Sequence, residues 1–399
     1  MCSIGDEGIE DEGPAKFMEK KLSLQDKTCV KCKTNRSVIL LRSKDCYCKE
    51  CFVNGTLHKF KAFLGKLRLS RRDEKVLVSY KTGHVTCTLL QFLRNGLDTM
   101  AEQKRLKFQP IFIYVEKNYH LSLEERKNVL KTISEHVNHF NFKLYMVSFG
   151  DYIKTGQLTL FESWNTIKLS EDNNDIYEIL KEKTKLTYQK EIFHIFERDL
   201  LIKSAKSLDC SFIFTTDLTA DIAVNLLTNV SLGRGNQLPL DIGVIDDRDE
   251  IKIIKPMRHL NMKECVFYNY FNNVEPVITR VIDEKPYSSV QNLLTNFIDK
   301  LQVDYPATVT TVLRTGDKLS MDLANQSICE FCKAPIFMNK DKFISSEATN
   351  FSRHLSTMQL NMDVTPTERY EKAVSSYSSS DDKKDLCYSC KIISEFIIK

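Results

Sequence analysis

Eight of the thirteen cysteines of this chain fall into four C-x-x-C pairs, a spacing that is typical of metal ligands. The first two pairs, CVKC at 29–32 and CKEC at 48–51, are separated by 15 residues, as in zinc ribbons and treble clefs. Each two-residue gap forms a tight turn that directs both sulfurs of a pair at one ion, about 2.3 Å away. We therefore predict a structural zinc site that is made of Cys29, Cys32, Cys48 and Cys51.

The two remaining pairs, CEFC at 329–332 and CYSC at 387–390, predict a second zinc site, although 54 residues lie between them. Because closure entropy grows only slowly with loop length, this pairing is reasonable. Its ligands would be Cys329, Cys332, Cys387 and Cys390. Sites made only of cysteine leave no open position for water and usually stabilise a fold. Knuckle turns without metal and a redox role for a C-x-x-C pair are the alternatives.

Cys46 complicates the first site, because it competes with Cys48 as a ligand. Cys48 is favoured because it completes a C-x-x-C pair.

A basic stretch, HKFKAFLGKLRLSRR at 58–72, follows the first cysteine module. Its cations could follow a phosphate backbone, and an exposed phenylalanine, Phe60 or Phe63, could stack on a base. The alternative is a helix with a solvated charged face, whose phenylalanines pack into the core. Its place between a zinc module and a nucleotide-type fold favours RNA binding, through Lys59, Lys61, Lys66, Arg68, Arg71 and Arg72.

KVLVSYKTGHVTCTLLQFL, at 75–93, begins as a strand, breaks at a glycine and resumes as a helix. This order usually places phosphates on the helix N-terminus, where free N–H groups and the macrodipole attract anions. A phosphate-binding turn needs small residues, however, and here the turn contains Tyr80 and Lys81. The stretch therefore leaves open whether a nucleotide site still works.

Apolar runs that alternate with amphipathic stretches surround this loop. The amphipathic stretches predict helices at 85–97 and 123–140. The apolar runs predict buried parallel strands at 75–80, 111–116, 142–149 and 210–217. The alternation predicts an α/β fold with a doubly wound, mostly parallel sheet. Ligands of such sheets bind outside the carboxyl ends of the strands.

The 399 residues are enough for two or three units. A net charge of only +4 means that any basic surface for nucleic acid must be local. With an acidic start and no apolar run of about 18 residues, we expect no signal peptide and no membrane span, and a reducing compartment. We expect a flexible N-terminus at 1–25, followed by a zinc module with a basic connector at 26–72. The α/β domain is expected at 73–285, with a helical insertion at about 150–190. The C-terminal part, at 286–399, should contain a helix near 288–301, a disordered stretch at 375–385 and the second cysteine module.

Together these motifs resemble the cytoplasmic tRNA 2-thiolation protein 2 family, the partner subunit of the tRNA wobble-uridine thiolase. The resemblance covers nearly the whole chain and rests on CVKCK, on CKECF leading into HKFKAFLGK, and on DYPATVTTVLRTGDKL at 304–319. It implies a PP-loop fold of the adenine nucleotide alpha hydrolase type for the α/β domain.

The resemblance also implies that the nucleotide loop is degenerate. Active PP-loop enzymes carry S-G-G-x-D-S after the first strand, and only the first serine is kept here. Bulky side chains in place of the two glycines would obstruct the backbone's approach to pyrophosphate and disfavour positive φ. The loop in question is Ser79, Tyr80, Lys81, Thr82, Gly83 and His84.

A second stretch agrees. TTDLTADIA, at 215–223, keeps Asp221 and Ala223 of the family's T-G-H-N-x-D-D-x-A but lacks its glycine, histidine and asparagine. Catalytic relatives place further cysteines around this strand for an iron–sulfur cluster or a persulfide, whereas here only Cys210 and Cys265 stand nearby. We therefore expect no functional ATP site, no iron–sulfur cluster and no catalytic residue.

By resemblance, the chain is a cytoplasmic, non-catalytic subunit that forms a heterodimer with a catalytic PP-loop subunit and helps to bind tRNA. The substrates would be the wobble uridines of lysine, glutamate and glutamine tRNAs, and a thiocarboxylated ubiquitin-related protein would supply the sulfur. Two alternatives remain, namely a divergent enzyme that adenylates tRNA itself and a zinc-bearing adaptor that binds only proteins.

Overall fold

The computed structural model describes the larger part of the chain, in segments separated by gaps. The described residues are 27–41, 45–67, 74–100, 105–169, 182, 184–280, 284–319, 327–336, 345–357, 365, 367–368, 371–372, 374 and 386–398. The predicted flexible N-terminus at 1–25 and the predicted disordered stretch at 375–385 lie outside them, as do Arg68, Arg71 and Arg72.

A six-stranded sheet forms the centre of the molecule, with the strand order β5-β4-β3-β6-β8-β7. All neighbouring strands are parallel except β7, which runs antiparallel to β8. The strands are β3 (Lys75–Tyr80), β4 (Gln109–Glu116), β5 (Lys143–Ser148), β6 (Phe212–Phe214), β7 (Ile245–Asp246) and β8 (Lys252–Ile254). The predicted mostly parallel sheet is confirmed, and the two short strands β7 and β8 are additional to it.

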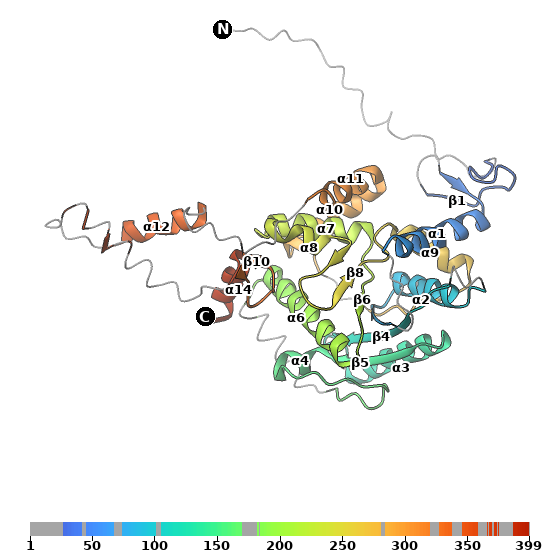
Figure 1. Ribbon diagram of the computed structural model, residues 1–399, viewed down its shortest axis with the longest axis horizontal. Helices are drawn as coiled ribbons and strands as arrows, with labels where there is room; N and C mark the ends of the chain where they lie inside the picture. The colour runs from blue at the N-terminus through green and yellow to red at the C-terminus, as the bar shows by residue number, and fades with distance from the viewer. Residues whose placement is uncertain are drawn as a thin grey trace, which may run out of the picture.

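Helices cover both faces of the sheet, because the strands bury apolar side chains on both sides. On β3, Val76 and Val78 face a core shared with α1, α2, α3 and α9, whereas Leu77 faces a second core formed with α4 and α6. Figure 1 shows α6 and α4 away from α1, α2 and α9. These helices are α1 (Lys49–Leu67), α2 (His84–Leu97), α3 (Leu123–His139), α4 (Phe149–Thr155), α6 (Leu186–Ser207) and α9 (Met262–Phe271).

A further group of helices follows β6 and lies along the sheet's β8 side. Helices α10 and α11 pack on α7 through a buried apolar cluster that contains Ala223, Ile298 and Val309. Pro306 starts α11 directly after α10, as a proline at the first helical turn can. The elements are α7 (Thr219–Ser231), the 3-10 turn η4 (Gly235–Gln237), α8 (Leu238–Ile242), α10 (Val290–Asp304) and α11 (Pro306–Gly316).

Each cysteine module is built on a short antiparallel hairpin. The first contains β1 (Ile39–Leu40) and β2 (Cys46–Tyr47), and the second contains β9 (Ser327–Ile328) and β10 (Pro335–Ile336), followed by α12 (Ser345–Thr357) and α14 (Tyr388–Ile398). Figure 1 shows β1 and β10 on opposite sides of the α/β unit. Phe52 and Phe60 of α1 belong to the main core, so the first module is joined firmly to the sheet.

The structure describes residues 150–169, 182 and 184–190 of the predicted helical insertion at about 150–190. Helix α4 ends at Thr155, and Phe161 then forms an antiparallel bridge with Met146 of β5. Residues 170–181 lie outside the described residues, and α6, which starts at Leu186, packs on the sheet. None of the helices in the described segments is long and apolar enough to cross a membrane.

Candidate functional site

The four cysteines of the first module form a compact group that could hold one metal ion. The ligand sulfurs of Cys29, Cys32, Cys48 and Cys51 lie within 4.8 Å of one another, and the Cys32 and Cys48 sulfurs are 3.9 Å apart. An ion about 2.3 Å from four tetrahedral sulfurs separates them by about 3.8 Å, so the spacing fits one ion. Cys46, although buried, is not part of this group.

The second module repeats this arrangement. The sulfurs of Cys329, Cys332, Cys387 and Cys390 lie within 4.8 Å of one another, and those of Cys332 and Cys387 are 3.7 Å apart. Both modules use the same knuckle. Lys33 and Lys333 each adopt a φ of 58°, and their N–H groups donate to the carbonyl oxygens of Cys29 and Cys329. The 54-residue separation is therefore compatible with a closed site.

The side chain of Tyr80 does not fill the nucleotide loop. Its ring lies in the main core against Tyr114, and its hydroxyl is 2.8 Å from Nδ1 of His136. Because β3 continues to residue 80, its alternation turns Tyr80 inward together with Val78. The prediction that this phenol obstructs the phosphate position is wrong.

A later segment of the chain occupies the loop instead. The Gly83 N–H donates to the carbonyl oxygen of Val277 over 2.8 Å, and the Thr82 and Thr279 hydroxyls are also 2.8 Å apart. We call residues 274–280 the covering segment. An anion at the N-terminus of α2 would require such N–H groups, and here a backbone carbonyl accepts one of them.

Helix α9 holds the covering segment in place. Asn269, at the end of α9, is buried, and its amide donates to the carbonyl oxygen of His84 over 2.9 Å. The same side chain accepts hydrogen bonds from Thr88 and Gln91 of α2. The chain that follows α9 is thereby directed across the start of α2.

Gly83 itself adopts a conformation that favours glycine, with φ 123° and ψ −177°. The loop thus keeps one glycine for its bend, although this glycine stands where active enzymes carry aspartate. A second loop donor, the Lys81 N–H, donates to the Thr86 hydroxyl over 3.2 Å.

A cavity of about 260 Å³ lies beside this loop, at the carboxyl ends of β3, β6 and β8, and we call it the switch-point cavity. The chain crosses from β3 to β4 on one side and returns to β6 on the other, so this is the topological switch point where doubly wound folds bind ligands. Ser79, Lys81, Asp217 and Lys255 are among its lining residues.

The lysines and arginines that line the switch-point cavity, apart from Lys255, have acidic partners in the chain. Lys81 Nζ is 3.8 Å from Asp217 Oδ1, and burial would lower the pKa of Lys81, but the charge of Asp217 raises it overall. Arg248 contacts both Asp241 and Asp246 over 2.6 Å. Much of the positive charge that would attract a polyphosphate is therefore already neutralised.

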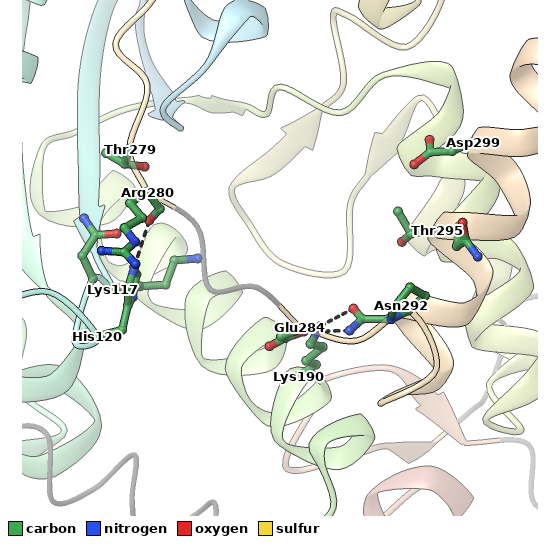
Figure 2. A pocket seen from close by; sticks show the side chains of 12 residues that line it. Lys117, His120, Lys190, Thr279, Arg280, Glu284, Asn292, Thr295 and Asp299 are labelled. Carbon is green, nitrogen blue, oxygen red and sulfur yellow. Dashed lines mark hydrogen bonds and ion pairs between the residues drawn. The ribbon is translucent and has the colours of Figure 1, made fainter.

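A more open cavity of about 730 Å³, the outer cavity, lies next to it beyond the end of β4 (Figure 2). Figure 2 shows Lys117, His120 and Arg280 together on one side and Asp299 on the other. Lys190 lines both cavities and contacts Glu284 and Asn292. Apart from Pro286, the described residues that line the outer cavity carry polar or charged side chains.

Two of the lysines predicted to bind RNA also make contacts within the chain. Lys59 Nζ is 2.5 Å from the buried carboxylate of Glu264, and Lys61 donates to the Thr99 hydroxyl over 3.1 Å. Lys66 is exposed near the end of α1, whereas Arg68, Arg71 and Arg72 lie outside the described residues. Phe60 and Phe63 are buried, so their rings pack in the core and do not offer a stacking surface.

The cysteines near the second family stretch do not have the character of nucleophiles. Burial raises the pKa of Cys210 to about 11 and that of Cys265 to about 12, so both thiols stay protonated at neutral pH. Asp221 accepts the Leu218 N–H at the start of α7, and Ala223 is buried against α10 and α11. In this chain the stretch at 215–223 therefore stabilises the start of α7.

Sequence reasoning missed both the covering segment and the ion pairs around the cavities. The acidic and basic run IDDRDE at 245–250 was a visible indication of the ion pairs, because it contains Asp246 and Arg248. The covering segment has no comparable motif.

The comparisons with known proteins agree with the fold. The U34-tRNA thiolase NcsA from Methanococcus maripaludis, solved with its [4Fe-4S] cluster, superposes with a TM-score of 0.55 over 76% of this chain and 95% of its own, at 18% identity. This likeness concerns the fold alone. The sheet and its switch point define a PP-loop-like α/β protein that carries two four-cysteine modules.

Sequence comparisons give the family. The family model for cytoplasmic tRNA 2-thiolation protein 2 matches residues 289–392. The protein of that name from Aedes aegypti is 30% identical, with 98% of each chain covered, and the 2-B protein from Xenopus laevis is 28% identical over 89% of this chain and 81% of its own. The chain belongs to the cytoplasmic tRNA 2-thiolation protein 2 family.

Proposed function

We propose that this protein is a non-catalytic subunit of a cytoplasmic complex that 2-thiolates the wobble uridine of lysine, glutamate and glutamine tRNAs. It pairs with a catalytic PP-loop subunit and helps to hold the tRNA, while a thiocarboxylated ubiquitin-related protein supplies the sulfur. The names of its relatives support tRNA thiolation and the cytoplasm.

The observation that carries the non-catalytic role is the hydrogen bond from Gly83 to Val277. A PP-loop enzyme grips pyrophosphate with loop N–H groups, and here such a donor is used by the chain's own carbonyl. Phosphate binding would require the covering segment to leave. The ion pair between Lys81 and Asp217 adds a second obstacle, because it lowers the positive charge at the cavity mouth.

We propose that both cysteine groups hold zinc. The sulfur separations of 3.9 Å and 3.7 Å fit four thiolates on a single ion. In a four-iron cluster each thiolate binds a different iron, which sets the sulfurs farther apart. Zinc would supply no chemistry to the substrate, because four cysteines leave no open coordination position, and it would instead stabilise the two modules.

We propose that tRNA contacts come from the end of α1 and the residues after it, namely Lys66, Arg68, Arg71 and Arg72. Lys59 and Lys61 lie on the same helix and were predicted to contribute, but their hydrogen-bond partners reduce what they can offer to a phosphate.

The experiment is a reconstituted thiolation assay in which each chain is omitted in turn. Thiolated tRNA should require both subunits, whereas the isolated chain should form no AMP from ATP in the presence of tRNA. Robust AMP formation by the isolated chain would support the second candidate, a divergent enzyme that adenylates tRNA. The open switch-point cavity of about 260 Å³ is the observation that favours this candidate.

A further inference from the structure

The C-terminal cysteine group packs against an arginine-rich part of the α/β unit. Ile195 of α6 belongs to the same buried cluster as Cys329, Cys332 and Cys390. The Cys332 sulfur is 3.8 Å from Oε1 of Gln237, in η4. A small, fairly enclosed cavity of about 70 Å³, the arginine cavity, lies at this contact, and Cys332, Arg198, Arg234 and Arg248 are among its lining residues.

Arg234 is the most incompletely satisfied of these arginines. Only 4% of its side chain is exposed, and Nη1 is 2.8 Å from Oε2 of Glu191. Its Nε and Nη2 atoms are buried without a hydrogen-bond partner among the described residues. Buried guanidinium donors that lack partners destabilise a protein unless a compensating charge lies close by.

The proposed metal would create such a charge. A divalent ion held by four thiolates leaves a net charge of −2, whereas four protonated thiols carry none. This charge would arise beside Arg234, because Arg234 and Cys332 line the same small cavity. Protein groups around a metal's ligands typically change metal affinity by 10–100-fold.

We propose that Arg234 stabilises the negatively charged metal–thiolate group of the C-terminal site, and that Gln237 donates an amide hydrogen to the Cys332 sulfur. The inference rests on the proposed occupancy of this site by zinc. The oxygen and nitrogen of a glutamine amide are assigned from their hydrogen-bond partners. Because a thiolate can only accept a hydrogen bond, a thiolate at Cys332 requires the amide nitrogen of Gln237, and not its oxygen, to face the sulfur.

The arrangement also connects the metal to the switch-point cavity. Glu191 and Arg248 line that cavity as well, and Arg248 contacts Asp241 and Asp246 there. The metal group and the cavity wall therefore share the same charged side chains.

The test is metal retention by the full-length chain under competition with a chelator. Cysteines released from metal are alkylated and mapped by peptide mass spectrometry, so the two sites are measured separately in one sample. With Arg234→Ala, the C-terminal cysteines should become reactive at a 10–100-fold lower chelator concentration, whereas the N-terminal site, the internal control, should be unchanged.

A second variant separates charge from simple packing. Glu191→Gln removes the carboxylate that compensates Arg234 and should make the C-terminal metal harder to remove, because more of the guanidinium charge acts on the thiolates. A purely structural role predicts that both variants weaken the site, and this result would overturn the proposal. An unchanged site in both variants would do so too. If Arg234→Ala fails to fold, Glu191→Gln decides alone.

Failure of the zinc assignment would look different. In that case the C-terminal cysteines of the unaltered protein are alkylated without chelator, or metal analysis finds iron in place of zinc. The non-catalytic role in thiolation does not depend on either outcome.

Discussion

Lys59 and Lys66 lie on the same helix, but the structure gives them different roles, and replacing each by alanine tests this difference. Lys59 Nζ is 2.5 Å from Oε1 of Glu264, whose side chain is only 4% exposed. The other oxygen of Glu264 accepts the Asn261 N–H over 3.0 Å at the start of α9. Lys59→Ala therefore leaves a buried carboxylate without its cation.

The size of the effect follows from exposure. Removing one partner of a fully buried ion pair costs about 3–5 kcal/mol. The Lys59 side chain is 47% exposed, so water can partly replace it, and we expect a loss of about 1–2 kcal/mol. Lys66→Ala, at an exposed position, should change the free energy of unfolding by less than about 0.5 kcal/mol.

Urea denaturation followed by circular dichroism measures the stability of both variants. tRNA binding as a function of salt measures the phosphate contacts, because losing one contact reduces the slope of log K against log salt by about 1. Lys66→Ala should reduce this slope and Lys59→Ala should not. If Lys59→Ala reduced the slope and left stability unchanged, the ion pair with Glu264 would not be its role.

Three other outcomes are expected. Gly83→Ala should destabilise the protein by about 1–3 kcal/mol in denaturant titrations, because φ 123° is strained for alanine although its methyl group meets no atom within 4 Å; an unchanged midpoint would contradict this. Arg126→Met should lower the free energy of unfolding by about 3–5 kcal/mol, because the buried Glu116 carboxylate, which lies 2.5 Å from Nη2 of Arg126, then loses its cation. Adding Glu116→Gln to this variant should recover part of the loss. Burial would raise the pKa of Glu197, but the charge of Lys117 is the main cause that lowers it to about 2. The ion pair between Glu197 and Lys117 therefore stabilises the fold above the ordinary glutamate pKa, and this stabilisation is lost as pH falls toward 2. Glu197→Gln should flatten the fall in thermal midpoint over this pH range, and an unaltered acid profile would count against this ion pair.

The sequence predicted the sheet well because its strands are buried on both faces. KVLVSY is mostly apolar, and β3 covers all six of its residues, from Lys75 to Tyr80. β7 and β8 were missed because they have only two and three residues, too few for a hydrophobic period to appear. The cysteine groups were predictable because metal ligation ties spacing directly to geometry.

The nucleotide loop shows where sequence reasoning stops. The substitutions predicted a degenerate loop, but the expected obstruction by Tyr80 is wrong, because strand alternation turns the ring into the core. The actual occupant, Val277, contributes a carbonyl group that every residue type carries, so no side chain could have revealed it. Contacts between backbone groups about 200 residues apart depend on how α9 packs on α2, and this packing is a tertiary property.

The central claim, that the loop no longer binds a nucleotide phosphate, is tested most directly by calorimetric titration of the isolated, metal-loaded protein with a non-hydrolysable ATP analogue and magnesium. With Val277 bonded to Gly83, we expect no saturable heat up to millimolar nucleotide. Saturable micromolar binding that Lys81→Ala abolishes would contradict the claim.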